Sequence, residues 1–326
     1  MSNAYATLVS RFTRLYRYQH LSAIAAWDQA AMMPDAGNDA RGAALAELAV
    51  LMHETITAPA LGAALTAAAA EVGDPVEAAS VREMKRQWQT ANVLPANLVE
   101  AKSLAGSRCE HAWRTQRKTN DWDGFLANWR PVVDLARQEA TLLAEATGLS
   151  RYDALVDRFE PGMRSAEIER VFSELKGWLP SLVSEVIDKQ QTESVIEPVG
   201  PFPIDQQRAL GLEIMRLLGF DFAGGRLDIS THPFCGGVPE DVRITTRYAE
   251  DNFVQAIMGI VHETGHARYE QRLPRAWVHL PLGQARSMGV HESQSLAFEM
   301  QLGRSEPFLS QIAPLVAAHF GAQPAF

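Results

Sequence analysis

Hydrophobic residues recur at helical spacing over most of this chain. Between residues 5 and 31, Leu8, Phe12 and Leu15 fall on one helical face, and Pro34 ends the run. The same period predicts further helices over residues 41–53, 76–90, 95–119, 122–147, 165–191, 205–218, 251–271 and 286–304. The pattern therefore predicts a mainly α fold.

The pattern changes between residues 220 and 250, where Gly, Pro and β-branched residues gather. Residues 227–229 and 242–246 read as short strands, with Val242 and Ile244 on one face and Arg243 and Thr245 on the other. We expect one small antiparallel sheet just before the next helix. Since the sequence contains no internal repeat and no low-complexity linker, residues 1–326 are predicted to form a single domain.

Composition narrows the classes of function. The chain has 326 residues, 47% of them hydrophobic, and a net charge of -9, which argues against nucleic acid as the main partner because phosphate binding favours a basic surface. No apolar stretch approaches the roughly 18 residues needed to cross a bilayer, so no membrane partner is expected. The N-terminus lacks the features of a signal peptide, and two cysteines cannot form a disulfide framework. These features favour the cytoplasm.

The predicted helix over residues 251–271 contains the motif H-E-x-x-H. On a helix, His262 and His266 are one turn apart on the same face, so both imidazoles can reach one metal ion. Glu263 points about 100° away from His262, beside the ion, where a carboxylate can take a proton from water. The alternative is a chance pairing of two histidines. Gly259 and Gly265 argue against chance, because glycine lets another element or a ligand approach closely.

Catalytic zinc usually has three protein ligands and one open position. The downstream candidates for the third ligand are His279, His291, Glu292 and Glu299. His291 and Glu292 are adjacent and diverge on a helix, so we expect only one of them to bind the ion. Glu299 is predicted either to orient a ligand imidazole or to be a surface carboxylate. Cys235 can be read as a fourth ligand or redox switch, but a small residue in a turn is the favoured interpretation.

Four motifs follow one another along the chain. They are His232-Pro233-Phe234, D-x-R-x-T at residues 241–245, H-E-x-x-H at residues 262–266 and H-E-S-x-S at residues 291–295. In this order they resemble the carboxypeptidase Taq family of zinc metallocarboxypeptidases. The resemblance covers almost the whole chain and is far more specific than H-E-x-x-H alone.

The resemblance implies a peptidase that removes single residues from peptide C-termini with the help of Zn²⁺, or alternatively Co²⁺. Its ligands would be His262, His266 and Glu292, with Glu263 as general base. The family's architecture implies long helices around a gluzincin-like cleft, and its members commonly form homodimers.

Further residues outside the metal motif are predicted to take part in the site. His232, Asp241, Arg243, Thr245 and His291 are predicted to contact substrate or to support the metal ligands, as is Glu299. A small sheet beside the cleft would carry three of these residues, and an extended peptide can add to such a strand by main-chain hydrogen bonds.

Two later motifs of the family, I-R-x-x-A-D and G-x-x-Q-D-x-H-W, are absent from these 326 residues. In the family they include an arginine that grips the substrate carboxylate, so we expect a domain shortened at its C-terminus. Arg243, Arg247 and Arg286 are candidate substitutes, although a structural role for each is the favoured interpretation. The alternatives to a carboxypeptidase are an endo- or oligopeptidase with the same metal core, and a catalytically silent module for peptide binding or dimerisation.

Overall fold

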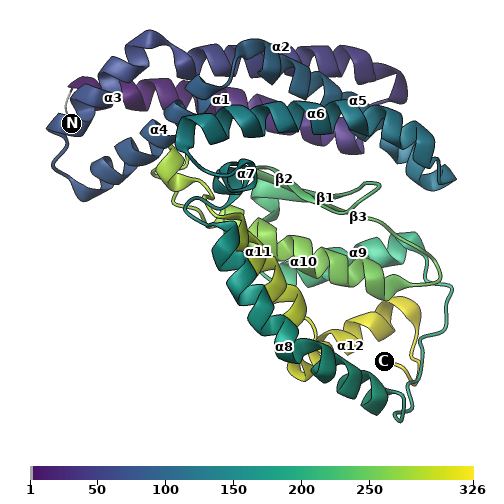
Figure 1. Ribbon diagram of the computed structural model, residues 1–326. Helices are drawn as coiled ribbons and strands as arrows, with labels where there is room; N and C mark the ends of the chain where they lie inside the picture. The colour runs from purple at the N-terminus through teal and green to yellow at the C-terminus, as the bar shows by residue number, and fades with distance from the viewer. Residues whose placement is uncertain (1–2) are drawn as a thin grey trace.

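The computed structural model describes residues 3–326, and most of them are helical. The first six helices form the upper layer in Figure 1. They are α1 (Asn3–Ala31), α2 (Asn38–Thr57), α3 (Pro59–Glu71), α4 (Pro75–Val93), α5 (Ala96–Thr119) and α6 (Trp122–Thr147), with a 3-10 turn at Asp35–Gly37.

The ends of these helices follow local capping chemistry. The side chain of Asp74 accepts from the N–H groups of Val76 and Glu77 at the start of α4, and Asp121 accepts from Gly124 at the start of α6. Gly148 ends α6 with φ 72°, a left-handed conformation that glycine adopts without strain. Sequence-local signals therefore place these helix ends.

The rest of the chain forms the sheet and the lower layer (Figure 1). The helices are α7 (Arg151–Phe159), α8 (Ser165–Gln190), α9 (Ile204–Leu217), α10 (Phe253–Gln271), α11 (Met288–Leu296) and α12 (Glu306–Phe320). A π-helical segment at Ala297–Leu302 follows α11, and 3-10 turns lie at Phe222–Gly224 and Pro281–Gly283. The strands are β1 (Gly225–Ile229), β2 (Cys235–Val238) and β3 (Asp241–Thr246).

The three strands form one mixed sheet with the order β1-β3-β2. The predicted antiparallel sheet is wrong for one pair of strands. β1 runs parallel to β3, and only β2 is antiparallel to it. The reason is β2, a strand that the pattern of the Gly-rich segment does not predict. Because the chain reverses direction before β2 and again after it, β3 runs in the same direction as β1.

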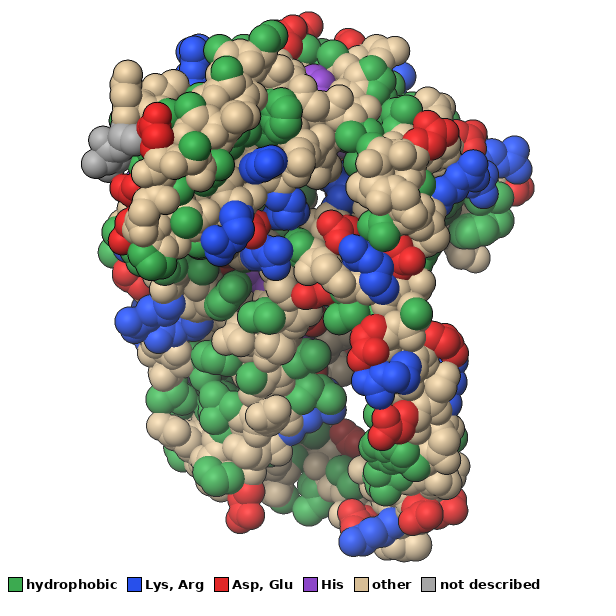
Figure 2. All heavy atoms as spheres, turned by 60° about the vertical axis from the view of Figure 1, so that its left-hand side comes forward, with side chains coloured by type: hydrophobic (Ala, Val, Ile, Leu, Met, Phe, Trp, Pro, Cys, Tyr) green, Lys and Arg blue, Asp and Glu red, His purple; other side chains and the backbone are tan. Residues whose placement is uncertain are grey.

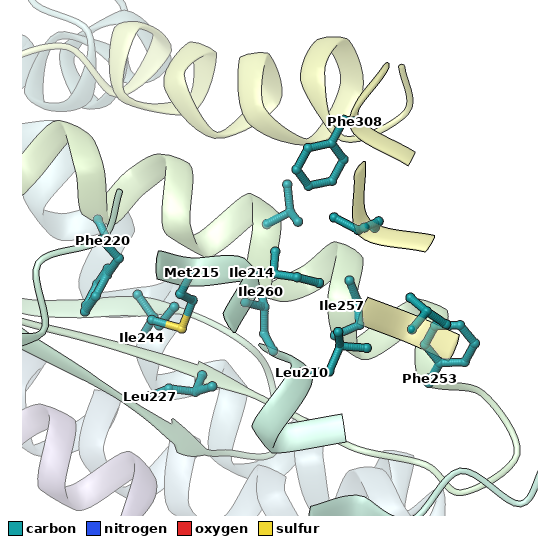
Figure 3. Close-up of a cluster of buried hydrophobic side chains, with 14 of the residues drawn as sticks. Leu210, Ile214, Met215, Phe220, Leu227, Ile244, Phe253, Ile257, Ile260 and Phe308 are labelled. Carbon is teal, nitrogen blue, oxygen red and sulfur yellow. The ribbon is translucent and has the colours of Figure 1, made fainter. Parts of the chain in front are cut away.

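The main hydrophobic core lies between this sheet and the helices below it (Figure 3). Val242 and Ile244 of β3 are 1% and 0% exposed, as the predicted alternation of faces requires. Ile257 and Ile260 of α10 pack into the same cluster. A fully buried aliphatic side chain contributes about 1.5–3 kcal/mol, so this core fixes α10 firmly beneath the sheet.

The prediction of a mainly α chain is confirmed, and eight predicted helices correspond to α1, α2, α4–α6 and α8–α10. The predicted helix over residues 286–304 begins at Met288 and becomes π-helical at Ala297. The predictions do not include α3, α7 or α12. α3 is rich in alanine and offers little contrast between faces, while α12 contains Pro314, a residue that usually interrupts helices.

α8 is the least buried of the long helices, and none of its residues is buried. Its exposed hydrophobic side chains are Val171, Phe172, Trp178, Leu179, Leu182, Val183, Val186 and Ile187. Figure 2 shows hydrophobic side chains among charged ones on the lower half of one face of the molecule. Large exposed apolar patches usually mark an interaction surface, so α8 is a candidate for one.

Among the described residues, no single helix has the length and apolar character to cross a membrane. One bent pair, residues 35–57 with Pro59–Glu71, meets both criteria only when its two parts are taken together across a 45° bend.

Candidate metal centre

α10 carries both histidines of the H-E-x-x-H motif. The Asn252 side chain caps its first turn by accepting from the Gln255 N–H, and hydrophobic residues hold its other face in the core. Four residues apart, His262 and His266 lie on one face with ring centroids 5.0 Å apart. Their side chains are 22% and 12% exposed, so both rings are largely covered but reachable.

Glu292 of α11 faces the two imidazoles. Its Oε1 lies 3.7 Å from His262 Nε2, and its Oε2 lies 3.4 Å from His266 Nε2. The candidate ligand atoms of the three residues all lie within 4.8 Å of one another. Two ligands that are each about 2.0–2.1 Å from a tetrahedral ion are separated by about 3.4 Å, so the three residues fit a shared zinc-sized cation.

The two helices come together through small residues and an irregular turn. They are in contact beneath the sheet (Figure 1). A Cβ at Gly265 would lie 2.6 Å from Ser295 Cα, so the close approach expected at this glycine is present. Gly259 has no such neighbour, since a Cβ there would meet Thr246 Oγ1 at 3.8 Å. Beyond α11, the Gly303 N–H donates to the Phe298 carbonyl five residues earlier, as a π-helix requires.

Each histidine has a hydrogen-bond partner on the nitrogen that faces away from Glu292. His262 Nδ1 lies 2.9 Å from Glu299 Oε2, and the other oxygen of Glu299 accepts from Arg304 at 2.8 Å. His266 Nδ1 lies 2.7 Å from His291 Nδ1. Metal-binding histidines usually donate their second nitrogen to an acceptor, and both histidines have a partner at that position.

Glu270 is a member of this cluster that the sequence interpretation missed. Its Oε1 lies 2.8 Å from His291 Nε2. A signal for it was present in the sequence, because Glu270 is four residues after His266 and eight after His262 and so shares their helical face.

The environment shifts the proton affinities of two site residues. Burial raises the pKa of Glu263 to about 8, and the Glu292 carboxylate adds to the rise. Burial lowers the pKa of His266 to about 4, with further lowering by His291 and His262. A neutral His266 keeps its Nε2 lone pair available for a cation.

Three predicted substrate residues on β3 are engaged within the protein. Asp241 accepts two hydrogen bonds from Arg243, at 2.9 and 2.6 Å, and this guanidinium lies 4.6 Å from the centre of the Trp27 ring. Thr245 is fully buried, and its hydroxyl lies 2.7 Å from that of Ser230. These contacts give all three residues a structural role, and their predicted contact with substrate stays a prediction.

The remaining predicted residues have different surroundings. His232 is exposed, in the loop between β1 and β2, and its predicted contact with substrate also stays a prediction. Arg286 pairs with Glu83 at 3.0 Å, whereas Arg247 is exposed and forms no ion pair among residues 3–326. Cys235 lies on β2, where burial and the Glu263 and Glu270 carboxylates raise the pKa of its thiol. This shift opposes the thiolate that a ligand or redox switch needs.

Known proteins of similar sequence identify the family of this chain. The sequence pattern of the Carboxypeptidase Taq (M32) metallopeptidase family matches residues 7–325. Thermostable carboxypeptidase 1 of Thermus thermophilus is 39% identical over 308 residues, which are 90% of this chain and 60% of that protein. Thermostable carboxypeptidase 1 of Pyrococcus furiosus is 30% identical over 315 residues, or 95% of this chain and 62% of that protein.

Solved structures give the same result. Metallocarboxypeptidase 1 of Trypanosoma cruzi superposes with a TM-score of 0.89 at 47% identity, covering 99% of this chain and 66% of that one. The chain thus spans about three fifths of the length of its sequence relatives. From the match over residues 7–325, the chain belongs to the carboxypeptidase Taq (M32) family of metallopeptidases.

Proposed function

We propose that this chain holds the metal centre and general base of a carboxypeptidase that acts on peptides. The observation that carries the proposal is the convergence of three side chains. His262 Nε2 and His266 Nε2 face the two Glu292 oxygens at 3.7 and 3.4 Å, beside the buried Glu263. We propose Zn²⁺ as the ion, with Co²⁺ as the alternative, because two imidazoles and one carboxylate are a donor set of catalytic zinc.

When bound, a divalent cation supplies Lewis acidity, polarising the scissile carbonyl and lowering the pKa of water to roughly 7. Glu263 takes the proton of the attacking water and passes it to the nitrogen of the leaving residue. Burial, which raises the pKa of this carboxyl to about 8, favours its protonated form and so suits the acceptance step. A divalent cation held by His262, His266 and Glu292 would favour the carboxylate form of Glu263 by its charge, and this is the form that accepts the proton.

Removal of a C-terminal residue, rather than internal cleavage, needs a cation for the substrate's carboxylate. Arg243 pairs with Asp241 and Arg286 with Glu83. Arg247 remains as the candidate of the three, although the cleft of about 700 Å³ that it lines with Arg117 and Lys118 contains no residue of the metal centre. Because the chain spans about three fifths of its named relatives, the choice between carboxypeptidase and endo- or oligopeptidase is open to experiment.

Glu263→Gln is the test of the proposed base. It keeps the shape of the side chain but cannot accept the proton, so we expect turnover to fall by about 10²–10⁴-fold. Zinc content measured by atomic absorption should remain that of the unaltered chain. If the variant keeps more than a tenth of the activity, Glu263 is not the base.

The substrate class needs a matched pair of peptides. We expect hydrolysis of an N-blocked dipeptide with a free C-terminus and no hydrolysis of its C-terminal amide. Cleavage of both would indicate an endo- or oligopeptidase. Zinc binding without cleavage of either peptide would favour the alternative function, a catalytically silent module for peptide binding or dimerisation.

The exposed apolar face of α8 favours the second candidate function, a catalytically silent module for dimerisation. It also favours the predicted homodimer. Phe172, Trp178 and Val183 are 52%, 48% and 47% exposed. We propose that this face binds a second copy of the chain, because burying it would remove apolar surface from water. Light scattering after gel filtration should give twice the chain mass of 35.9 kDa, and Val183→Glu should return it to one. A monomer in the unaltered protein would contradict this proposal.

Two further expectations stay predictions. One is a cytoplasmic location, with which the free thiols of Cys109 and Cys235 are compatible. The other is that residues 1–326 behave as one domain, for which a single cooperative unfolding transition would be the supporting result.

A further inference from the structure

The two candidate histidine ligands are supported in different ways. His262 meets the Glu299 carboxylate directly, at 2.9 Å. His266 meets a second imidazole, His291, whose other nitrogen meets Glu270. The second arrangement is thus a chain of three side chains from α10 to α11 and back to α10.

Only one arrangement of protons satisfies this chain with His266 as a ligand. A neutral imidazole has one nitrogen that donates and one that accepts. If His266 offers Nε2 to a cation, its proton is on Nδ1, and this N–H donates to His291 Nδ1 at 2.7 Å. His291 then has its proton on Nε2 and donates to Glu270 at 2.8 Å. Both nitrogens of His291 are used, so neither is free for substrate in this arrangement.

The surroundings hold this chain of contacts in place. The side chains of His291 and Glu270 are 13% and 21% exposed. The Tyr269 ring packs edge-on against His291, with centroids 5.1 Å apart. Glu270 and His291 also line a small cavity of about 100 Å³ next to β2. His291 is adjacent to Glu292 in sequence, so its link to α10 also bears on where the third candidate ligand lies.

We propose that Glu270 and His291 act together as positioning residues, holding His266 in the tautomer and orientation that leave Nε2 free for the metal ion. This inference rests on the proposed function, because it takes His266 as a ligand. It assigns to Glu270 the part that Glu299 plays for His262, with His291 as the intermediate.

Zinc affinity, measured by competition with a chromogenic chelator, tests the inference without requiring activity. Glu270→Leu removes the acceptor and should weaken zinc binding by about 10–100-fold. Glu270→Gln keeps an acceptor oxygen and should fall between that variant and the unaltered chain. The matched control is Glu213→Leu, which removes a carboxylate 3.3 Å from His319. This control should bind zinc within twofold of the unaltered chain.

A coupling experiment separates positioning from a general structural role. In a His291→Phe background, Glu270→Leu should cause little further loss of zinc affinity, because the path to His266 is already broken. Urea unfolding of the metal-free proteins should show that the Glu270→Leu and Glu213→Leu variants lose comparable stability. A drop in zinc affinity that only follows a larger loss of stability would overturn the inference.

The remaining outcomes are also decisive. Zinc affinity within twofold of the unaltered chain for Glu270→Leu would overturn the positioning role but leave the proposed function intact. An equal effect of Glu270→Leu with and without His291 would show that the path does not pass through His291, and would overturn it too. If the unaltered chain binds no zinc, the proposed function fails, and this inference fails with it.

Discussion

Replacing Gly265 with alanine tests how closely α10 and α11 must pack for the metal centre to form. A Cβ at this position would lie 2.6 Å from Ser295 Cα and 2.8 Å from the Gln294 carbonyl oxygen. Non-bonded carbon atoms prefer about 3.5–4.0 Å, so the shortfall is about 1 Å. Both neighbours are main-chain atoms, and relief therefore requires a shift of the helix rather than a rotation of a side chain.

Two free-energy terms of opposite sign follow from this contact. Overpacking typically costs about 1–3 kcal/mol. Alanine gains about 0.5–1 kcal/mol over glycine within a helix. We expect the metal-free Gly265→Ala variant to lose about 1–2 kcal/mol in urea unfolding. Because metal–ligand distances tolerate only about 0.2 Å, a shift of Glu292 should also lower zinc affinity at least about tenfold.

Gly259 provides the matched control in the same helix. A Cβ there would meet Thr246 Oγ1 at 3.8 Å, an ordinary contact. Gly259→Ala should therefore keep its zinc affinity and gain about 0.5–1 kcal/mol. The reasoning is refuted if Gly265→Ala matches Gly259→Ala in both unfolding and chelator competition.

Two other perturbations test charges that the fold buries. In the folded metal-free protein the pKa of Glu263 is raised from 4.5 to about 8, so the folded state binds this proton more tightly than the unfolded chain does. The stabilising contribution of the protonated carboxyl group is therefore complete below pH 4.5 and is lost as the pH rises through 8. One pKa unit corresponds to 1.36 kcal/mol, so the stability of Glu263→Gln relative to the unaltered chain should rise by up to roughly 5 kcal/mol between pH 4.5 and 9. Urea unfolding of the two metal-free proteins across this pH range measures the difference. A difference that stays constant with pH would contradict the prediction. Glu139, only 3% exposed between Lys102 and Arg158, ties α6 to α5 and α7. Glu139→Leu should cost about 2–4 kcal/mol in thermal unfolding. The control is Glu174→Gln in the exposed pair with Arg170, which should change stability by less than about 0.5 kcal/mol. Equal effects of the two substitutions would show that the buried carboxylate contributes little.

The predictable part of the fold is the part in which local pattern and burial agree. α10 has an apolar stripe, an N-cap at Asn252 and two histidines at helical spacing, all visible in the sequence. β2 was not predicted because Gly236 and Gly237 have low strand propensity, and the strand exists because β3 offers it a pairing edge. α12 persists despite Pro314 because Phe308, Ile312 and Val316 are buried in the core.

In the candidate site, too, local sequence pattern predicts some residues and not others. The spacing of His262, Glu263 and His266 follows from one helical turn, so the sequence by itself determined that two imidazoles share a face with a carboxylate beside them. Resemblance to a family named Glu292, but no local rule says which residue of a later helix will face that pair. The position of Glu292 depends on the close contact at Gly265.

The sequence alone thus determined the helical character of the chain, the H-E-x-x-H face and the class of metal chemistry, because these depend on residues within a turn or two of each other. Only the tertiary structure decided the mixed sheet, the position of the Arg243 guanidinium over the Trp27 ring, and the link from Glu270 through His291 to His266. Those features join segments that are distant along the chain or packed across helices. Their geometry is set by the packing of whole helices and strands, which the short-range periodicity of hydrophobic residues does not predict.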